Sequence, residues 1–236
     1  MMTFMALNNT LQALACRART VRQGAVLGLA GAALALLGGC AALPDKPLRS
    51  VMYDFGPGAP PVQSAAPAAG ALPPLALAEV TLAGSALDGT AMLYRLGYSN
   101  AQQLHPYAQA RWSMPPGQLL GQRLRERLSQ QRAIVTASQG QALKRSQNAN
   151  VALLRLELEE FSQLFDTPQA SAGLIRLRAT LLAITPTGEQ LIAQRTVAVQ
   201  RPAPSADAAG GVQALSAAAD AAIDELAPWL AQTGPR

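Results

Sequence analysis

The sequence predicts an α+β fold in which a two-layer, mostly antiparallel sheet carries two main helices on one face. In 151–161 and 173–184, apolar residues alternate with charged or polar ones, which is typical of strands with one buried face. In 116–131 and 212–230, apolar residues instead recur at helical spacing. We expect these elements in one domain over 75–236, preceded by a separate N-terminal segment and a linker rich in Pro and Ala.

The two long strands fit a single register when they are placed antiparallel. Glu159 then lies opposite Arg176 and Glu157 lies opposite Arg178, while the leucine faces of both strands also match. Cross-strand pairs of opposite charge stabilise a sheet by roughly 0.2–1 kcal/mol each. A shift by one residue would turn the charges into the core, whereas the pattern leaves a shift by two open.

Both helical segments carry boundary signals. Ser113 is expected to be the N-cap of the first helix, because Pro115 and Pro116 suit its first turn. Pro228 is expected to kink or end the second helix, since proline lacks the amide donor that a helix interior needs.

The first 39 residues have the parts of a secretory signal peptide. Arg17, Arg19 and Arg22 supply a basic start, and an uncharged apolar run follows over 25–37. A membrane-spanning helix needs about 20 apolar residues, and the run over 25–37 is shorter than that. We therefore predict a cleaved signal peptide over 1–39 and place a retained N-terminal anchor second.

The segment Leu37-Gly38-Gly39-Cys40 resembles the bacterial lipobox. The resemblance implies that the Cys40 thiol is acylated, that the chain is cut before Cys40 and that the new amine is acylated as well. Ala41, in place of Asp, implies sorting to the outer membrane. The second cysteine of the sequence, Cys16, lies in the leader, so the mature chain has no intramolecular disulfide.

The charge of the mature chain gives no argument for nucleic-acid binding. The full sequence has a formal charge of +5, from 19 basic and 14 acidic residues. Three of the basic residues lie in the leader, which contains no Asp or Glu, so the mature chain has 16 basic residues and a balance of +2. So small an excess does not indicate a polyanionic partner.

Residues 40–74 are predicted to be an acylated tether with a Pro/Gly/Ala-rich spacer, in which 51–55 could form a short strand. The stretch 56–74 carries no charge and favours extended polyproline conformations. Two interpretations stay open: a spacer that lifts the domain off the membrane, and a long loop inside one domain.

The mature sequence contains few residues that suit catalysis or metal binding. His105 is its one histidine and precedes a proline in a predicted strand, so a structural role is favoured over that of a base. One imidazole without a free thiolate does not suit zinc. Glu157, Glu159 and Glu160 could suggest a calcium or glycosidase site, but the strand register already gives the first two arginine partners. We predict no enzyme, no metal and no cofactor.

Arg111 and Trp112 are the candidate partner-binding residues, because both types favour the centres of interfaces. The alternative is that Trp112 ends a strand and covers the first turn of the next helix.

Several motifs occur in an order that resembles the ABC-type transport auxiliary lipoproteins, a PqiC-like family. They are "MLYR" (92–95), "LHPYAQARWSMPPGQLLGQRLRERL" (104–128) and the alternating "LLRLELEEF" strand (153–161), all after a lipobox. The similarity covers the chain from about Val51 to its C-terminus. Tyr53-Asp54-Phe55 departs from the entry strand of the family.

The resemblance implies a docking role without catalysis. Members accompany envelope lipid-transport systems, in which an inner-membrane ABC transporter works with MCE proteins that bridge the periplasm. This lipoprotein would be the outer-membrane end, anchored through Cys40 at the periplasmic face. Its partners would be an MCE-domain protein and the ABC transporter complex, and a homo-oligomer is left open.

Two other functions are kept as alternatives. A lipid-carrying or lipopolysaccharide-assembly lipoprotein would need an apolar groove between the sheet and the helices. An envelope hydrolase would need His105, because a Ser-His-acid triad has no other histidine in the mature sequence.

Overall fold

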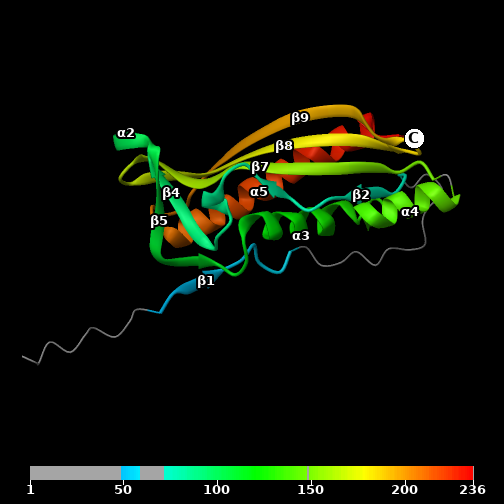
Figure 1. Ribbon diagram of the computed structural model, residues 1–236. Helices are drawn as coiled ribbons and strands as arrows, with labels where there is room; N and C mark the ends of the chain where they lie inside the picture. Colours follow the sequence, from blue (N-terminus) through cyan, green and yellow to red (C-terminus); the bar gives the residue numbers. More distant parts are fainter. Residues whose placement is uncertain (1–48, 59–71, 148, 236) are drawn as a thin grey trace, which may run out of the picture. The chain divides into compact units, whose positions relative to one another are not determined.

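The structure is a computed structural model that describes residues 49–58, 72–147 and 149–235 (Figure 1). The predicted signal peptide over 1–39, Cys40 and part of the predicted linker lie outside these residues. From Arg49 onward the chain forms one compact unit. None of the helices within the described ranges combines the length and the hydropathy of a membrane span.

The described residues form nine strands in one sheet, four α-helices and a short 3-10 helix. In chain order they are β1 (Val51–Tyr53), β2 (Leu75–Leu77), β3 (Thr81–Leu82), η2 (Ser85–Leu87), β4 (Ala91–Leu96), α2 (Gly97–Asn100), β5 (Ala101–Trp112), α3 (Pro116–Leu128), β6 (Ile134–Thr136), α4 (Ala137–Gln147), β7 (Ala152–Thr167), β8 (Ala170–Thr185), β9 (Gly188–Pro202) and α5 (Ala208–Thr233).

Strand β7 is the centre of the sheet. Along one edge it pairs antiparallel with β8, which in turn pairs antiparallel with β9. Along the other edge it pairs in parallel, one after another, with the short strands β2, β3 and β4. The sheet continues from β2 to β6, and from β4 through β5 to β1.

The expectation of a mostly antiparallel sheet needs correction, because the sheet is mixed. Five of its eight strand pairings are parallel. The long hairpins that the sequence pattern reveals are antiparallel, whereas the parallel partners of β7 are only two to six residues long. Strands this short carry too little alternation to indicate which neighbour they pair with.

The β7–β8 hairpin has the expected register up to a β-bulge. Glu157 lies opposite Arg178, with 3.4 Å between their charged groups. The bulge then places Glu160 opposite Arg176, while Glu159 forms an ion pair with Arg178. The predicted pairing of Glu159 with Arg176 is therefore wrong, because β7 contains one extra residue at this point.

One face of the sheet and two helices enclose the main hydrophobic core. Helix α3 contributes Leu120 and Leu124, helix α5 contributes Leu215 and Ile223, and β7 contributes Leu154, all of them fully buried. Both helices therefore form a second layer on the same face of the sheet.

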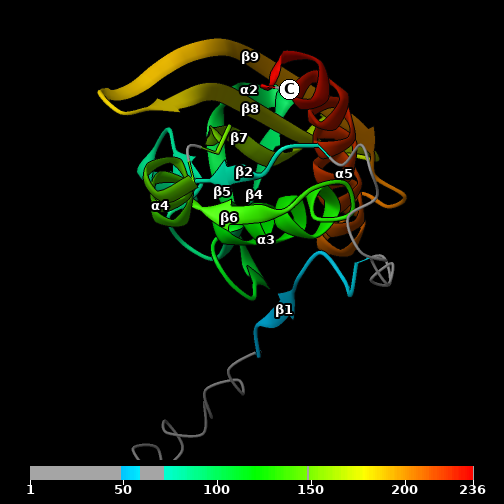
Figure 2. The ribbon, with the colours of Figure 1, turned by 90° about the vertical axis from the view of Figure 1, so that its right-hand side faces the viewer.

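The shorter helix α4 covers part of the opposite face. Its Leu143 packs against a smaller cluster that includes Leu153, Leu182 and Ile184. Because neighbouring strand residues point to opposite faces, Leu153 lies on the face opposite to that of Leu154. Helices α4 and α5 accordingly lie on opposite sides of the view in Figure 2.

The chain before the Pro-rich stretch belongs to the folded domain. Strand β1 pairs in parallel with β5, and the Ser113 amide donates a hydrogen bond of 2.7 Å to the Tyr53 carbonyl. Phe55 is buried in the main core, as is Leu75 on the far side of the stretch. Residues 56–74 thus begin and end on the same domain, which favours the loop over the spacer between anchor and domain.

Two helix boundaries differ from expectation. Pro115, which makes no side-chain capping hydrogen bond, occupies the N-cap of α3, so the expectation for Ser113 is wrong. Helix α5 begins after the N-cap Asp207, whose carboxylate accepts a hydrogen bond from the Gly210 amide. It continues past Pro228 to its last residue, Thr233, so Pro228 does not end it.

Candidate functional site

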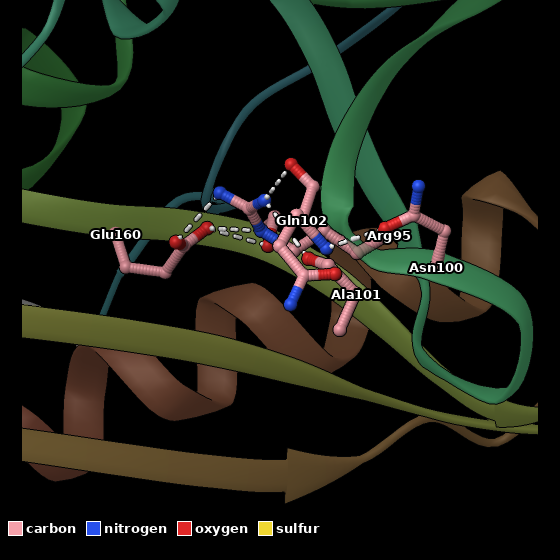
Figure 3. Close-up of polar contacts among 6 residues, drawn as sticks. Arg95, Asn100, Ala101, Gln102 and Glu160 are labelled. Carbon is pink, nitrogen blue, oxygen red and sulfur yellow. Dashed lines mark hydrogen bonds and ion pairs between the residues drawn. The ribbon is translucent and has the colours of Figure 1, made fainter.

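Arg95 fixes the connection between β4 and β5, which we call the hairpin tip (residues 95–102). Its Nη2 donates to Glu160 Oε2 at 2.9 Å and its Nε donates to Glu160 Oε1 at 3.3 Å. Its Nη1 donates to the carbonyls of Ala101 and Gln102 at 3.2 and 3.3 Å. Figure 3 shows the guanidinium between the carboxylate and this backbone. One side chain therefore ties the tip to the central strand β7.

The hairpin tip presents an aromatic side chain to the surroundings. Asn100 Oδ1 accepts a hydrogen bond of 3.1 Å from the Gln102 amide, which closes the turn after α2. Within α2, the Tyr98 side chain is 49% exposed. A tyrosine held on a braced turn can bury much area on contact while losing little conformational freedom. This arrangement suits a docking surface.

An aromatic cluster lies at the base of the hairpin tip. The Tyr94 ring lies 4.7 Å from the Tyr107 ring and 5.9 Å from the Phe165 ring, between centroids. His105 stacks on Tyr94 across the β4–β5 pair, with 5.2 Å between centroids and 21° between ring planes. The contacts of His105 are therefore those of a packing residue.

A polar network joins the sheet to the start of α5. The Tyr107 hydroxyl donates to Gln163 Oε1 at 2.9 Å, and Gln163 Nε2 donates to Ser171 Oγ at 2.7 Å and to the Asp207 carbonyl at 3.1 Å. Burial, together with the nearby Tyr94 and Asp207, raises the pKa of Tyr107 to about 12. The hydroxyl therefore remains a donor at ordinary pH, and the network holds β5, β7, β8 and α5 in place.

Trp112 belongs to the core and not to a contact surface. It is 2% exposed and packs between Phe55 and Phe161, with ring centroids 5.8 and 5.4 Å away. Its predicted role in partner binding is corrected by this burial. The neighbouring Arg111 is half-buried and donates to the Ala110 carbonyl at 3.0 Å. Alternation along β5 explains the difference, since the two side chains point to opposite faces.

The described carboxylates do not gather into a metal site. Within residues 49–58, 72–147 and 149–235, no group of three or more His, Cys, Asp or Glu side chains lies where it could hold a metal ion. Glu157 and Glu159 both pair with Arg178, and Glu160 pairs with Arg95. The carboxylates that the sequence singled out thus have arginine partners.

The sequence analysis did not identify Arg95, Tyr98 or Glu160 as parts of one site. Arg95 and Glu160 are 65 residues apart in the chain and meet through the parallel pairing of β4 with β7. No local pattern reveals such a pairing. The sequence signal that could have indicated this site is the run "YRLGY" at the end of a predicted strand. It places Arg95 and Tyr98 on either side of a glycine.

No curated protein matches the chain. The solved structures that match the chain include two that share its fold. A protein of Xanthomonas campestris, assigned to the family model DUF330, has a TM-score of 0.60 at 20% sequence identity, over 78% of this chain and 96% of its own. An uncharacterised protein has a TM-score of 0.56 at 17% identity, over 78% and 99% of the two chains. At these identities the likeness shows the fold alone.

The comparison with family models identifies the family of the chain as well as its fold. The model described as "ABC-type transport auxiliary lipoprotein component" matches residues 53–227. This range begins at the end of β1, contains the hairpin tip and the aromatic cluster, and includes most of α5. The chain therefore belongs to the ABC-type transport auxiliary lipoprotein component family.

Proposed function

We propose that the protein is a lipid-anchored, non-catalytic docking or assembly component of an ABC/MCE-type envelope lipid transport system. It would act at the periplasmic face of the outer membrane. The observation that carries this proposal is the family match over 53–227, which takes in most of the core and the sheet, all of α3 and most of α5. The task of a component that assists transport is contact with the other subunits.

The proposed anchor is Cys40, acylated after removal of residues 1–39. The lipobox-like sequence before Cys40 supports it, and so does the lipoprotein character of the family. One acyl chain holds a protein at a membrane only marginally, whereas several chains hold it stably. Ala41 supports retention at the outer membrane.

The proposed docking surface for the MCE-domain protein is the hairpin tip with Tyr98. Its support is the exposed aromatic ring on a turn that Arg95 and Glu160 hold in place. Preorganisation of this kind reduces the entropy lost on binding. Arg111 remains a second candidate contact, and a homo-oligomer remains open.

The packing between sheet and helices disfavours the lipid-carrier alternative. The leucine faces that could have lined an apolar groove are filled: Leu156, Leu158, Leu177 and Leu226 are at most 1% exposed. A surface cleft of about 450 Å³ between α3 and residues 77–82 has Glu79, Asp88 and Arg125 in its lining. A second, of about 690 Å³ between α4 and the β8–β9 turn, is lined in part by Lys144, Arg145 and Glu189. Charged walls do not suit an acyl chain.

Co-purification tests the proposed function. The acylated protein is extracted from its own membranes in mild detergent, and an MCE-domain protein is expected among the recovered partners. Tyr98→Ala should reduce this recovery about tenfold or more, because truncation of an aromatic hot spot costs about 2 kcal/mol or more. Leu191→Ala is the matched control, since Leu191 is an apolar residue of β9 that is 65% exposed.

Failure would take two distinguishable forms. If the wild-type protein recovers no MCE partner under any mild condition, the transport role is rejected. If Tyr98→Ala and Leu191→Ala recover the partner equally well, the role stands and the hairpin tip is rejected as the docking surface.

A further inference from the structure

Strand β1 places two large apolar side chains in an exposed position. Met52 is 73% exposed and Val51 is 50% exposed. The strand lies at one end of the sheet order, and within the described residues its one pairing partner is β5. In both ribbon views it lies at the margin of the domain (Figures 1 and 2). Adjacent strand residues point to opposite faces, so Met52 is exposed on one face and Val51 on the other. Tyr53, on the same face as Val51, packs against the main core.

The exposed strand is nevertheless firmly part of the domain. The core residue Phe55 follows it, and the Arg123 guanidinium donates to the Phe55 carbonyl. Arg123 is itself buried, and its Nε lies 3.2 Å from an Asp220 carboxylate oxygen on α5. Exposure of Met52 is thus a feature of the folded state and not of a loose end.

The chain length before β1 limits how far this strand can lie from the predicted anchor. Ten residues, 41–50, separate Cys40 from Val51. Fully extended, at about 3.3–3.6 Å per residue, they reach at most about 40 Å, and as a flexible coil roughly 20 Å. The Pro-rich stretch adds nothing to this distance, because it follows β1 and Phe55 and returns to the domain at Leu75.

The charges around β1 suit a phospholipid surface. Arg49 is exposed two residues before Val51, and Arg111 lies opposite Met52 in the β1–β5 register. Arginine binds phosphate oxygens well. The nearby acids are Asp54, whose carboxylate accepts a hydrogen bond of 2.8 Å from the Gly56 amide, and Glu126, which lies 3.9 Å from the Arg123 guanidinium. Apolar side chains beside cations are the combination that an anionic membrane interface attracts.

We propose that β1 is a membrane-contact strand: Met52 and Val51 enter the interface of the lipid leaflet that holds Cys40, with Arg49 among the phosphates. The inference rests on the acylation of Cys40 in the proposed function. It goes beyond that function by orienting the domain, with the β1 end on the lipid surface.

Fluorescence quenching in vesicles tests the orientation. The full-length acylated protein is reconstituted into phosphatidylethanolamine–phosphatidylglycerol vesicles that carry a brominated lipid. A thiol-reactive, polarity-sensitive dye is placed by Met52→Cys, or by Val51→Cys as a second variant, since acylated Cys40 offers no competing thiol. Thr196→Cys is the control, because Thr196 is an exposed residue of β9.

The expected result is a blue-shifted emission at position 52 and quenching at least threefold stronger than at position 196. Equal quenching at both positions, in protein that carries its acyl chains, overturns the inference and leaves the proposed function intact. Shielding of position 52 that persists in detergent, without dependence on the brominated lipid, also overturns it, because a second polypeptide then covers β1. Failure of the wild-type protein to incorporate palmitate overturns both proposals.

Discussion

At the residue scale, Arg95 shows how much can depend on one ion pair. Its side chain is 20% exposed and that of Glu160 is 15% exposed, so water screens the pair only partly. Ser162 Oγ also donates to Glu160 Oε1 at 2.7 Å. The carboxylate is therefore placed to receive the guanidinium, and the guanidinium in turn binds the backbone of the hairpin tip.

Replacement of Arg95 with methionine should destabilise the protein by about 1–3 kcal/mol, because Glu160 then keeps a charge without its partner. Urea unfolding measures the change. Arg155→Met is the control: Arg155 also pairs with a glutamate, Glu189, but its side chain is 54% exposed, and an exposed pair contributes at most about 1 kcal/mol. If Arg95→Met and Arg155→Met lost equal stability, the prediction would be contradicted, because burial would then add nothing to the Arg95–Glu160 pair.

Residue-scale prediction from the sequence succeeded where the pattern was local and failed where it was not. Glu157 and Arg178 pair because their strands are joined by a short turn and share one alternation. Trp112 could not be assigned from sequence, since a buried and an exposed tryptophan at a strand end look alike. Its burial depends on Phe55 and Phe161, which come from distant parts of the chain.

At the element scale, helix α5 approaches the sheet closely at Gly173. A Cβ atom added at Gly173 on β8 would lie 2.5 Å from backbone atoms of Ala214 and Leu215 on α5. A backbone cannot turn aside as a flexible side chain can. The glycine therefore sets how near the helix lies to the strand.

Gly173→Ala should consequently destabilise the fold by about 1–3 kcal/mol, as expected when a packed core must shift to admit a methyl group. Thermal and urea unfolding would measure the loss. Gly84→Ala provides the comparison, since a Cβ atom there meets nothing within 4 Å, and a change within about 0.5 kcal/mol is expected. A neutral Gly173→Ala variant would mean that α5 packs less closely than described.

Elements were predicted well where they are long, and their pairings were predicted poorly where they are short. The alternation in β7 and β8 and the helical spacing in α3 and α5 each extend over several turns or pleats, so their type is evident from sequence. The parallel pairing of β2, β3 and β4 along a single edge of β7 involves two or three residue pairs each. Which strands make such short pairings depends on the tertiary structure of the whole domain and not on the local sequence.

At the scale of the whole molecule, the predicted leader and acylation site precede the compact unit in the chain. The compact unit begins at Arg49, nine residues after the predicted acylation site. Among the described residues, Phe55 belongs to this core and Tyr53 of β1 packs against it. Stability should therefore reside in the domain, and location should reside in the leader and Cys40.

This separation predicts the outcome of Cys40→Ser. The variant should lose palmitate incorporation and move from the membrane to the soluble fraction, because the sites for the acyl chains are lost. Its unfolding midpoint should stay within about 1 °C of the unacylated wild-type domain, since the compact unit begins only at Arg49 and a change outside the packed core shifts stability little. Radiolabelled palmitate, fractionation and thermal unfolding measure the three properties. Membrane retention without palmitate would reveal an uncleaved leader as the anchor, whereas a lowered midpoint would show that the tether takes part in the fold.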